Sequence, residues 1–289
     1  MTDSGLAMIA VHAHPDDESS KGGATMAKYA AEGVRVVVAT FTGGERGDVL
    51  NPKLKDDPAL LRDLPGRRRQ EMADAARILG VEQQFLGFVD SGLPEGDLAE
   101  PLPLGSFATV DPALAAVPLV ALIRKIRPQV LTTYDPSGGY PHPDHVHTHK
   151  VSMAALEIAA DPAVHPELGP AHQVPKIYYD QGISVDRAVA LDRALKARGL
   201  ESPYDQWVDR RREDQIREQR ITTQVPVAEF FPVRDAALRA HASQVDPDGW
   251  FFAVPRGIER EVWPHEDFEL AFTSVPVDLP ENDLFAGLR

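Results

Sequence analysis

The segment VRVVVATF (Val34–Phe41) is almost entirely apolar and contains four valines. Such a run does not alternate between apolar and polar residues, so it is typical of a strand that is buried on both faces of a parallel sheet. Three further short segments predict strands, at Leu6–Val11, Gln83–Phe88 and Gln129–Tyr134. A sheet of such strands has to be covered by helices on both faces.

Helical segments alternate with these strands. The sequence predicts helices at Ser19–Glu32, Arg67–Leu79, Pro112–Arg127 and Asp144–Ala160, the first two followed by Gly33 and Gly80, where glycine ends a helix. The alternation predicts an α/β fold with a Rossmann-like, mainly parallel sheet and helices on both faces. Ligand sites in such folds lie beyond the carboxyl ends of the strands.

The pattern weakens after Lys150. The segment KIYYDQG (Lys176–Gly182) predicts another strand, and the chain then becomes more charged. Helices are predicted at Asp192–Arg198, Pro203–Arg220 and Val233–Ser243. We therefore expect an α/β catalytic core at residues 1–183 and a mostly helical C-terminal extension at residues 184–289 that completes the site.

The composition narrows the classes of function. The 289 residues include no cysteine, which excludes disulfides and thiol nucleophiles, so any metal would be held by His, Asp or Glu. The formal net charge of −14 argues against nucleic acid or an anionic membrane as partner. The N-terminus lacks a basic segment, and no apolar run approaches the ~20 residues of a membrane span. We expect a cytoplasmic protein.

The segment HPDDE (His14–Glu18) places three carboxylates side by side directly after the first predicted strand. Crowded carboxylates repel one another unless a positive charge lies among them. Residues three apart lie on one side of a helical turn, so His14 and Asp17 can converge on one point while Asp16 faces a neighbouring one. The alternative is an acidic helix start, with Asp16 as the N-cap, which explains the carboxylates but not the histidine.

A second histidine-rich segment, YPHPDHVHTH, follows the fourth predicted strand. If a helix starts near Pro143, His145 and His149 lie one turn apart and could form a pair of metal ligands. Alternatively His145 is a ligand and His142 acts on the substrate; spacing does not decide among these three. His147 would point away as a surface residue. Two histidines and one carboxylate with an open position form a catalytic zinc arrangement.

The other candidates are weaker. His12 is expected to be a core residue, and His241, in a predicted helix, is a candidate for the active site on spacing alone. Arg67–Arg69 open a helix, either as a solvent-facing patch or as a contact to substrate. The segment TGGERG lacks the order of glycines that a dinucleotide site requires.

The motifs AHPDDE and HPDH strongly resemble those of the LmbE-like/PIG-L zinc hydrolases, which deacylate N-acyl-glucosamine compounds. Further similar segments are TGGERGDVLNP, LGFVDSGLPEGDL, TTYDPSGGYPHPDH and RDAALRAHASQVDP, so the likeness extends over nearly the whole chain. Within the family, SSKG and TGGERG are closer to the amidase branch, which acts on mycothiol S-conjugates, than to the deacetylase branch.

The resemblance implies roles for individual residues. The implied metal ligands are His14, Asp17 and His145, and the metal would be Zn²⁺, or Fe²⁺ since imidazole suits both. The implied catalytic residues are Asp16 as general base, His142 as general acid or oxyanion stabiliser, Tyr140 at the oxyanion, and Asp144 tuning His142. Candidates for contacts to substrate are Lys21, one of Arg68 and Arg69, Asp90 and His241. His149 would then be structural.

The implied reaction is hydrolysis of a small thiol–sugar conjugate into an N-acetylcysteine S-conjugate and glucosaminyl-inositol. The alternative within the family is deacetylation of N-acetyl-glucosaminyl-inositol. An alternative from another class is a sugar-binding protein with a degenerate site, against which the complete set of motif residues argues. The sequence leaves open whether His142 or Asp16 protonates the leaving amine, and which S-conjugates are preferred.

Overall fold

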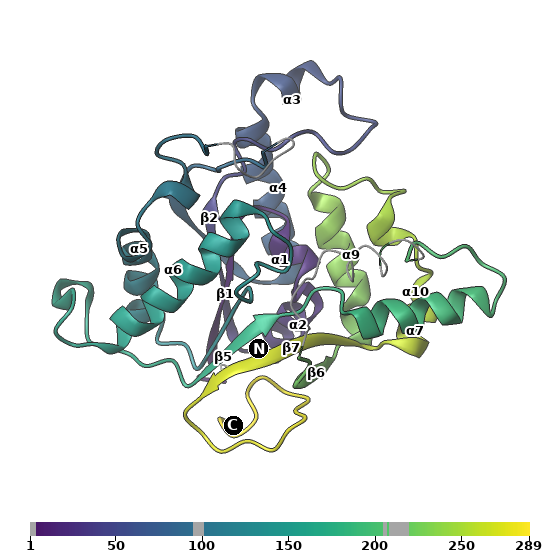
Figure 1. The fold of residues 1–289 in the computed structure, drawn as a ribbon. Helices are drawn as coiled ribbons and strands as arrows, with labels where there is room; N and C mark the ends of the chain where they lie inside the picture. The colour runs from purple at the N-terminus through teal and green to yellow at the C-terminus, as the bar shows by residue number, and fades with distance from the viewer. Residues whose placement is uncertain (1–3, 95–100, 205–206, 208–219) are drawn as a thin grey trace.

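A computed structural model describes residues 4–94, 101–204, 207 and 220–289. Within them lies one seven-stranded sheet, in the order β3-β2-β1-β4-β5-β7-β6 (Figure 1). The strands are β1 Ala7–His12, β2 Arg35–Thr42, β3 Glu82–Phe88, β4 Val130–Thr133, β5 Lys176–Asp180, β6 Thr223–Pro226 and β7 His265–Thr273. The first five pair in parallel, whereas β7 is antiparallel to both β5 and β6. The predicted α/β class is confirmed, with a mixed rather than wholly parallel sheet.

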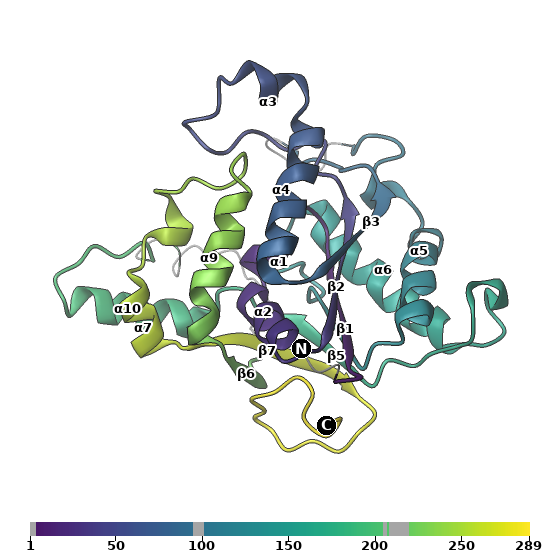
Figure 2. The same cartoon turned by 180° about the vertical axis from the view of Figure 1, so that it is seen from behind.

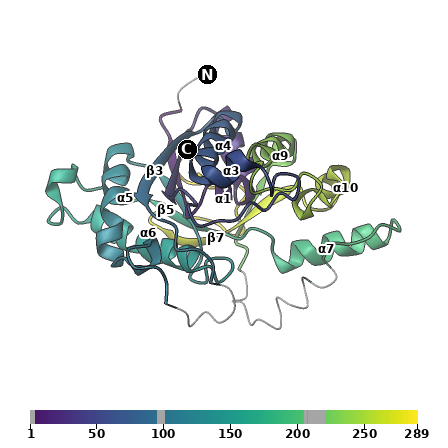
Figure 3. The ribbon, with the colours of Figure 1, turned by 90° about the horizontal axis from the view of Figure 1, so that it is seen from above.

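Helices cover both faces of this sheet (Figures 1 and 3). The helices described are α1 Asp17–Ser20, α2 Gly23–Ala31, α3 Pro58–Arg62, α4 Leu64–Leu79, α5 Pro112–Ile126, α6 Pro143–Ala160, α7 Val185–Lys196, α9 Phe231–Ala240 and α10 Arg256–Val262. Helices α5 and α6 pack on one face, and α2, α4 and α9 pack on the other (Figure 2).

Strand β1 shows how the sequence builds the two layers. Ile9 and Val11 lie in the core beneath α5 and α6, whereas Met8 and Ala10 lie in the core on the opposite face. Successive side chains of a strand point to opposite faces, so a strand covered on both sides needs apolar residues at every position. This is why the continuous apolar runs predicted the central strands.

The predicted helix at Ser19–Glu32 is wrong in one respect, because the structure has two helices there. Lys21 is extended between them, and Gly22 adopts a positive φ of 78°. A Cβ on Gly22 would lie 3.0 Å from Oδ1 of Asp180 at the end of β5. The break allows the Lys21 side chain to turn back toward Asp17, as described below.

The C-terminal part contributes two strands, β6 and β7, that the sequence analysis did not predict. The predicted helices Asp192–Arg198 and Val233–Ser243 correspond to α7 and α9, each beginning earlier than expected. Most of the predicted helix Pro203–Arg220 lies outside the described residues. Helices α7 and α10 share a small core of their own. Among the helices described, none is long and apolar enough to cross a membrane.

The strand order determines where a site can form. Strands β1 and β4 are neighbours, and the chain continues from them toward opposite edges of the sheet. This reversal leaves a crevice beyond their carboxyl ends, where α/β proteins bind ligands. The two histidine-containing motifs follow these two strands.

Candidate metal-dependent active site

The HPDDE motif forms a tight turn between β1 and α1. Asp16 has a φ of 109°, a backbone conformation that costs free energy for any residue other than glycine. The turn is closed by the His14 backbone N–H, which donates to Oδ2 of Asp17 at 3.0 Å. Asp16 occupies the N-cap position of α1, but its side chain makes no capping hydrogen bond. The N-cap explanation for this carboxylate is therefore not supported.

Three side chains converge at the end of β1 and could hold a metal ion: His14, Asp17 and His145, all buried. Oδ2 of Asp17 lies 3.5 Å from Nδ1 of His14 and 3.4 Å from Nε2 of His145. Ligand atoms arranged tetrahedrally at about 2.0 Å from zinc lie ~3.3 Å apart. The two distances from Asp17 are close to this value.

Hydrogen bonds on the outer side of each histidine fix its tautomer. Nδ1 of His145 donates to the carbonyl oxygen of Gly138 at 3.1 Å. Its Nε2 has no hydrogen-bond partner within the described part of the chain, although it is buried. Nε2 of His14 donates to Oδ2 of Asp144 at 3.2 Å, which leaves Nδ1 as the acceptor. Partners of this kind orient histidine ligands in metal sites.

A second group, of His14, His142 and Asp144, is also compact enough to hold a metal. In this group, however, Nε2 of His14 and Oδ2 of Asp144 already bind each other, although Oδ1 of Asp144 has no partner among the described residues. Nδ1 of His142 accepts the Asp144 N–H at 3.1 Å, and Oδ2 of Asp144 accepts the Ser91 N–H at 2.9 Å. We therefore favour the set with Asp17 and His145. His149 is directed elsewhere, because its Nδ1 donates to the Tyr134 carbonyl at 2.9 Å.

The rings of His142 and Tyr140 lie beside this set. The centroid of His142 is 4.7 Å from that of His14, and the centroid of Tyr140 is 4.6 Å from that of His145. Tyr140 remains 43% exposed, so its ring borders the open side of the site. Burial, together with the charges of His14 and His145, lowers the pKa of His142 to about 4.

The two neighbouring aspartates have different electrostatic surroundings. Although burial works in the opposite direction, the charges of His145 and Lys21 hold the pKa of Asp17 well below its usual range. Nζ of Lys21 donates to Oδ1 of Asp17 at 2.6 Å. Burial raises the pKa of Asp16 to about 6, against the opposing charge of Arg68. Asp17 is thus held as a carboxylate, and Asp16 has the proton affinity of a useful base.

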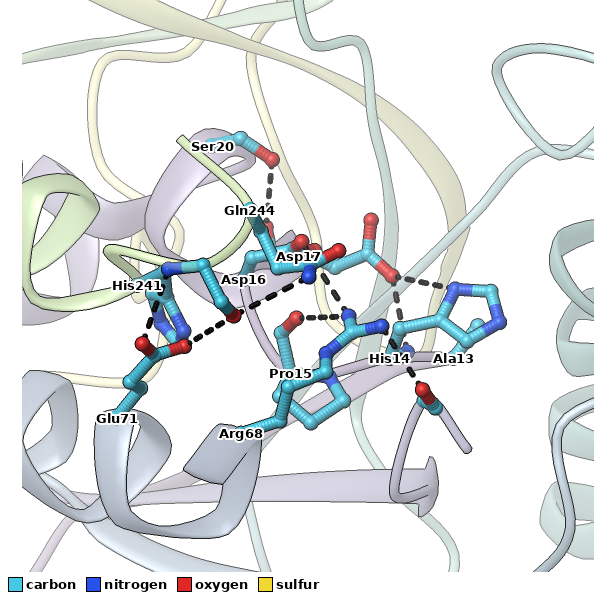
Figure 4. Close-up of polar contacts among 12 residues, drawn as sticks. Ala13, His14, Pro15, Asp16, Asp17, Ser20, Arg68, Glu71, His241 and Gln244 are labelled. Carbon is cyan, nitrogen blue, oxygen red and sulfur yellow. Dashed lines mark hydrogen bonds and ion pairs between the residues drawn. The ribbon is translucent and has the colours of Figure 1, made fainter. Parts of the chain in front are cut away.

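Of the two candidate arginines, the structure brings only Arg68 to the site. Arg68 is buried and donates to the carbonyl oxygens of Pro15 at 2.8 Å and Gly44 at 3.1 Å; it also lies 3.4 Å from Oδ2 of Asp16 (Figure 4). The Arg69 side chain is 62% exposed and lies 3.9 Å from Glu45.

Asp90 and Arg68 both contact the loop that follows β2. Asp90 is buried, with Oδ1 3.5 Å from Nε2 of His14. Its carboxylate accepts the backbone N–H groups of Arg46 at 3.2 Å and Gly92 at 2.8 Å. These contacts hold the loop after β2 against the loop after β3.

His241 reaches the site indirectly, from the end of α9. Its ring is fully buried, and its Nε2 lies 2.7 Å from Oε1 of Glu18. Glu18 in turn accepts the Asp16 backbone N–H at 2.9 Å. Although burial would raise it, the charge of His241 lowers the pKa of Glu18 to about 2. The sequence analysis assigned no role to Glu18, which here links His241 to the Asp16 backbone. The feature of the sequence that could have indicated it is its position within the acidic motif.

Tyr134 is a second residue that sequence reasoning missed. Its ring stacks on His145, with centroids 4.5 Å apart and planes 7° apart. Its hydroxyl accepts the Ala13 backbone N–H at 3.1 Å, and Nζ of Lys21 lies 5.6 Å from the ring centroid. The available signal was that this tyrosine ends the fourth predicted strand, at the edge of the sheet where ligands bind.

The prediction that His147 lies on the surface is wrong. His147 is buried, and its ring packs edge-on against Phe107 with centroids 4.8 Å apart. Helix α6 is covered by α5 and by the segment before it, so the side of α6 opposite the motif is not exposed. The prediction that His12 is a core residue is confirmed, since its side chain is fully buried.

Gly138 offers a test of how the loop orients His145. It has a φ of 75°, and a Cβ there would lie 2.7 Å from Cβ of His145 and 2.8 Å from the backbone nitrogen of Val146. We expect Gly138→Ala to weaken zinc binding about 10–100-fold, measured by competition with a chelator, because His145 loses its orienting carbonyl. Gly139→Ala is the matched control.

Gly139 has nearly the same φ, 76°, but nothing lies within 4 Å of its Cβ position. The two variants therefore introduce similar backbone strain, and only Gly138→Ala displaces the histidine. Equal losses of zinc affinity in both would attribute the effect to strain and contradict the orienting role.

Comparison with known proteins identifies the family. Residues 9–156 match the family described as "PIG-L: GlcNAc-PI de-N-acetylase". The chain is 57% identical to "Mycothiol S-conjugate amidase" of Streptomyces coelicolor, over 100% of this chain and 99% of that protein. The chain belongs to the PIG-L family. The family assignment predicted from the motifs is confirmed, and the matched segment contains the whole candidate metal-binding set.

Other PIG-L relatives differ in their named activity. A "1D-myo-inositol 2-acetamido-2-deoxy-alpha-D-glucopyranoside deacetylase" of Streptomyces avermitilis is 40% identical, with 97% of each chain covered. Among solved structures, the "N,N'-diacetylchitobiose deacetylase" from Pyrococcus horikoshii superposes with a TM-score of 0.63 at 20% identity, over 91% of this chain and 83% of that chain. This likeness supports the fold.

Proposed function

We propose that this PIG-L protein is a zinc-dependent amidase of the cytoplasm. It cleaves mycothiol S-conjugates into an N-acetylcysteine S-conjugate and glucosaminyl-inositol. The observation that carries this proposal is the end-to-end identity with the Streptomyces coelicolor amidase. The convergence of His14, Asp17 and His145 beside an acid–base candidate, Asp16, supports the hydrolytic chemistry.

The metal set consists of Nδ1 of His14, Oδ2 of Asp17 and Nε2 of His145. Zn²⁺ suits this donor set of two imidazoles and one carboxylate; Fe²⁺ is compatible with the same ligands. When bound, the metal supplies Lewis acidity, which makes the amide carbonyl more electrophilic and the attacking water more acidic. Lys21 on the other oxygen of Asp17 keeps that carboxylate ionised.

Asp16 accepts the proton of the water that attacks the amide carbonyl. The Asp16 backbone has a positive φ, and its N–H donates to the Glu18 carboxylate. This conformation directs the Asp16 carboxylate away from the capping position. Arg68, which binds the Pro15 carbonyl, fixes the turn from the other side. The pKa of Asp16 is raised to about 6. A base whose pKa lies near neutrality both takes and returns a proton readily.

His142 and Tyr140 stabilise the oxyanion. Because Nδ1 of His142 accepts the Asp144 N–H, a doubly protonated ring would lose that hydrogen bond. The ring therefore stays neutral and donates from Nε2, as Tyr140 donates from its hydroxyl. The nitrogen of the glucosamine leaves as a neutral amine when it takes the proton that Asp16 accepted. Because the His142 ring stays neutral, we propose that Asp16 and not His142 delivers this proton.

We assign the remaining candidate residues to different parts of the substrate. Arg68 and Asp90 contact the sugar–inositol half, and Lys21 discriminates between the amide substrates of the two family branches. The His241 ring binds Glu18, which accepts the Asp16 backbone N–H, so we assign it a positioning role through Glu18 instead of a substrate contact. In this way the extension at residues 184–289 completes the site of the core at residues 1–183.

A competition tests the proposed reaction. Zinc-loaded protein receives a mycothiol S-conjugate and N-acetyl-glucosaminyl-inositol at equal concentration, and mass spectrometry counts both products. We expect a large excess of the N-acetylcysteine S-conjugate. An excess of acetate would instead assign the protein to deacetylation, the activity named for the Streptomyces avermitilis relative. No product from either substrate would favour a sugar-binding protein without activity.

A further inference from the structure

A cavity of about 310 Å³ opens beside the metal-binding set. The two share a border, because Lys21, Tyr134 and Tyr140 line the cavity and also contact the set or stack on it. The volume lies at the lower end of the range for small-molecule sites. The lining residues beyond this border have no role in the proposed proton transfers or in binding the metal.

The far wall of the cavity is aromatic and aliphatic. It is lined by Tyr204, Leu238, Trp250, Phe251 and Val254, all from the C-terminal part of the chain. The centroid of Trp250 lies 6.0 Å from that of Tyr204 and 5.6 Å from that of Phe251. Trp250 and Phe251 are each 39% exposed, so this aromatic surface remains accessible. We refer to these five residues as the aromatic wall.

The cationic residues around the cavity are paired within the protein. Arg234 binds Glu259 at 3.0 Å, and Arg187 binds the same carboxylate. Arg256 binds Asp235 at 2.6 Å and also donates to the backbone carbonyl of Phe251. These three guanidinium groups share the carboxylates of Glu259 and Asp235, and Asp180, Glu266 and Asp267 also line the cavity. The ion pairs therefore hold the wall in place, and the carboxylates disfavour an anion in the cavity.

The position of the cavity relative to the scissile bond indicates which half of a substrate would enter it. Among the described residues, its lining includes Lys21 and Tyr140 but neither Arg68 nor Asp90. Hydrolysis of an amide places the acyl part and the amine part on opposite sides of the reacting carbon. If the sugar amine lies toward Arg68 and Asp90, the acyl part extends past Lys21 into the cavity.

We propose that this cavity binds the S-linked group of the substrate, and that the aromatic wall selects conjugates with apolar or aromatic thioether substituents. The inference rests on the proposed amidase function. The polar end of the cavity, with Lys21, Asp180 and Gln181, faces the N-acylcysteine amide, while the thioether substituent packs on Trp250 and Phe251. Burial of an apolar group on aromatic rings provides the selectivity.

The test compares two phenylalanines with equal exposure. Phe251 lies in the aromatic wall, whereas Phe272, also 39% exposed, lies on β7 outside the cavity lining. For Phe251→Ala we expect kcat/KM for an S-benzyl conjugate to fall about tenfold, through KM, and that for an S-methyl conjugate to change less than about twofold. Phe272→Ala should change neither. Trp250→Ala is the second wall variant, and thermal melting checks that all three fold.

A binding measurement separates this inference from the proposed function. We expect N-acetyl-S-benzylcysteine, titrated calorimetrically, to bind about tenfold more weakly to Phe251→Ala than to the wild type or Phe272→Ala. If wild-type protein cleaves neither conjugate, the amidase proposal and this inference both fail. If it cleaves both but the benzyl-to-methyl ratio is the same in the wall variants and in Phe272→Ala, only the assignment of the cavity is overturned.

Discussion

Replacing His145 with alanine is expected to remove the bound metal and lower kcat/KM on the order of a thousandfold. The variant deletes one of the three proposed ligands, and the Lewis acidity of a bound metal is worth several kcal/mol of transition-state stabilisation. Nε2 of His145 lies 3.4 Å from Asp17 and, although buried, has no hydrogen-bond partner among the described residues, so this atom is available to a metal. Metal content after dialysis against zinc, measured by mass spectrometry, and kcat/KM are the two measurements.

His147→Gln is the control for this prediction. It lies two residues along the same helix and is buried against Phe107, away from the metal set. We expect it to lower the melting temperature while retaining metal and activity. Full metal content in His145→Ala, or equal loss in His147→Gln, would contradict the ligand assignment.

Replacing Asp16 with asparagine is expected to lower kcat about 100–10,000-fold and leave metal content unchanged. Asparagine has the same shape, tolerates a positive φ better than most residues, and can still accept from Arg68, but it cannot take a proton. The KM for the conjugate should change little, since the role proposed for Asp16 involves the attacking water and not the sugar. Steady-state kinetics and metal analysis on the same preparation test both statements.

Asp111→Asn provides the same chemical change at a structural site. Asp111 caps α5 by accepting the Ala113 and Leu114 backbone N–H groups, and asparagine caps helices equally well. Its kinetics should match the wild type. If Asp16→Asn kept more than about a tenth of kcat, another group would have to be the base.

The central strands were predictable because of how they are buried. A strand covered on both faces, such as β1 or β2, requires apolar residues throughout, and this requirement is visible in the sequence. Strand β7 was not predicted, because its sequence HEDFELAFT is rich in carboxylates. One of them, Glu266, is buried and accepts the Ala24 and Thr25 backbone N–H groups at the start of α2. Its partners are some 240 residues away, so no local pattern reveals them.

The sequence by itself determined which chemical groups are present and at which edge of the sheet they lie. Motifs that follow strands of one parallel sheet lie at the same edge of that sheet, because the carboxyl ends of parallel strands point the same way. Their residue types, imidazole and carboxylate without any thiol, limited the metals that could bind.

Only the tertiary structure distinguishes the surroundings of residues that spacing leaves equivalent. His142, His145 and His149 are equivalent in spacing, but His142 caps α6, His145 donates to Gly138 and His149 donates to Tyr134. In the same way Arg68 enters the site while its neighbour Arg69 faces solvent. Spacing along a helix gives the direction of a side chain only to within a turn, whereas a hydrogen bond or a ligand position is set by contacts with distant parts of the chain.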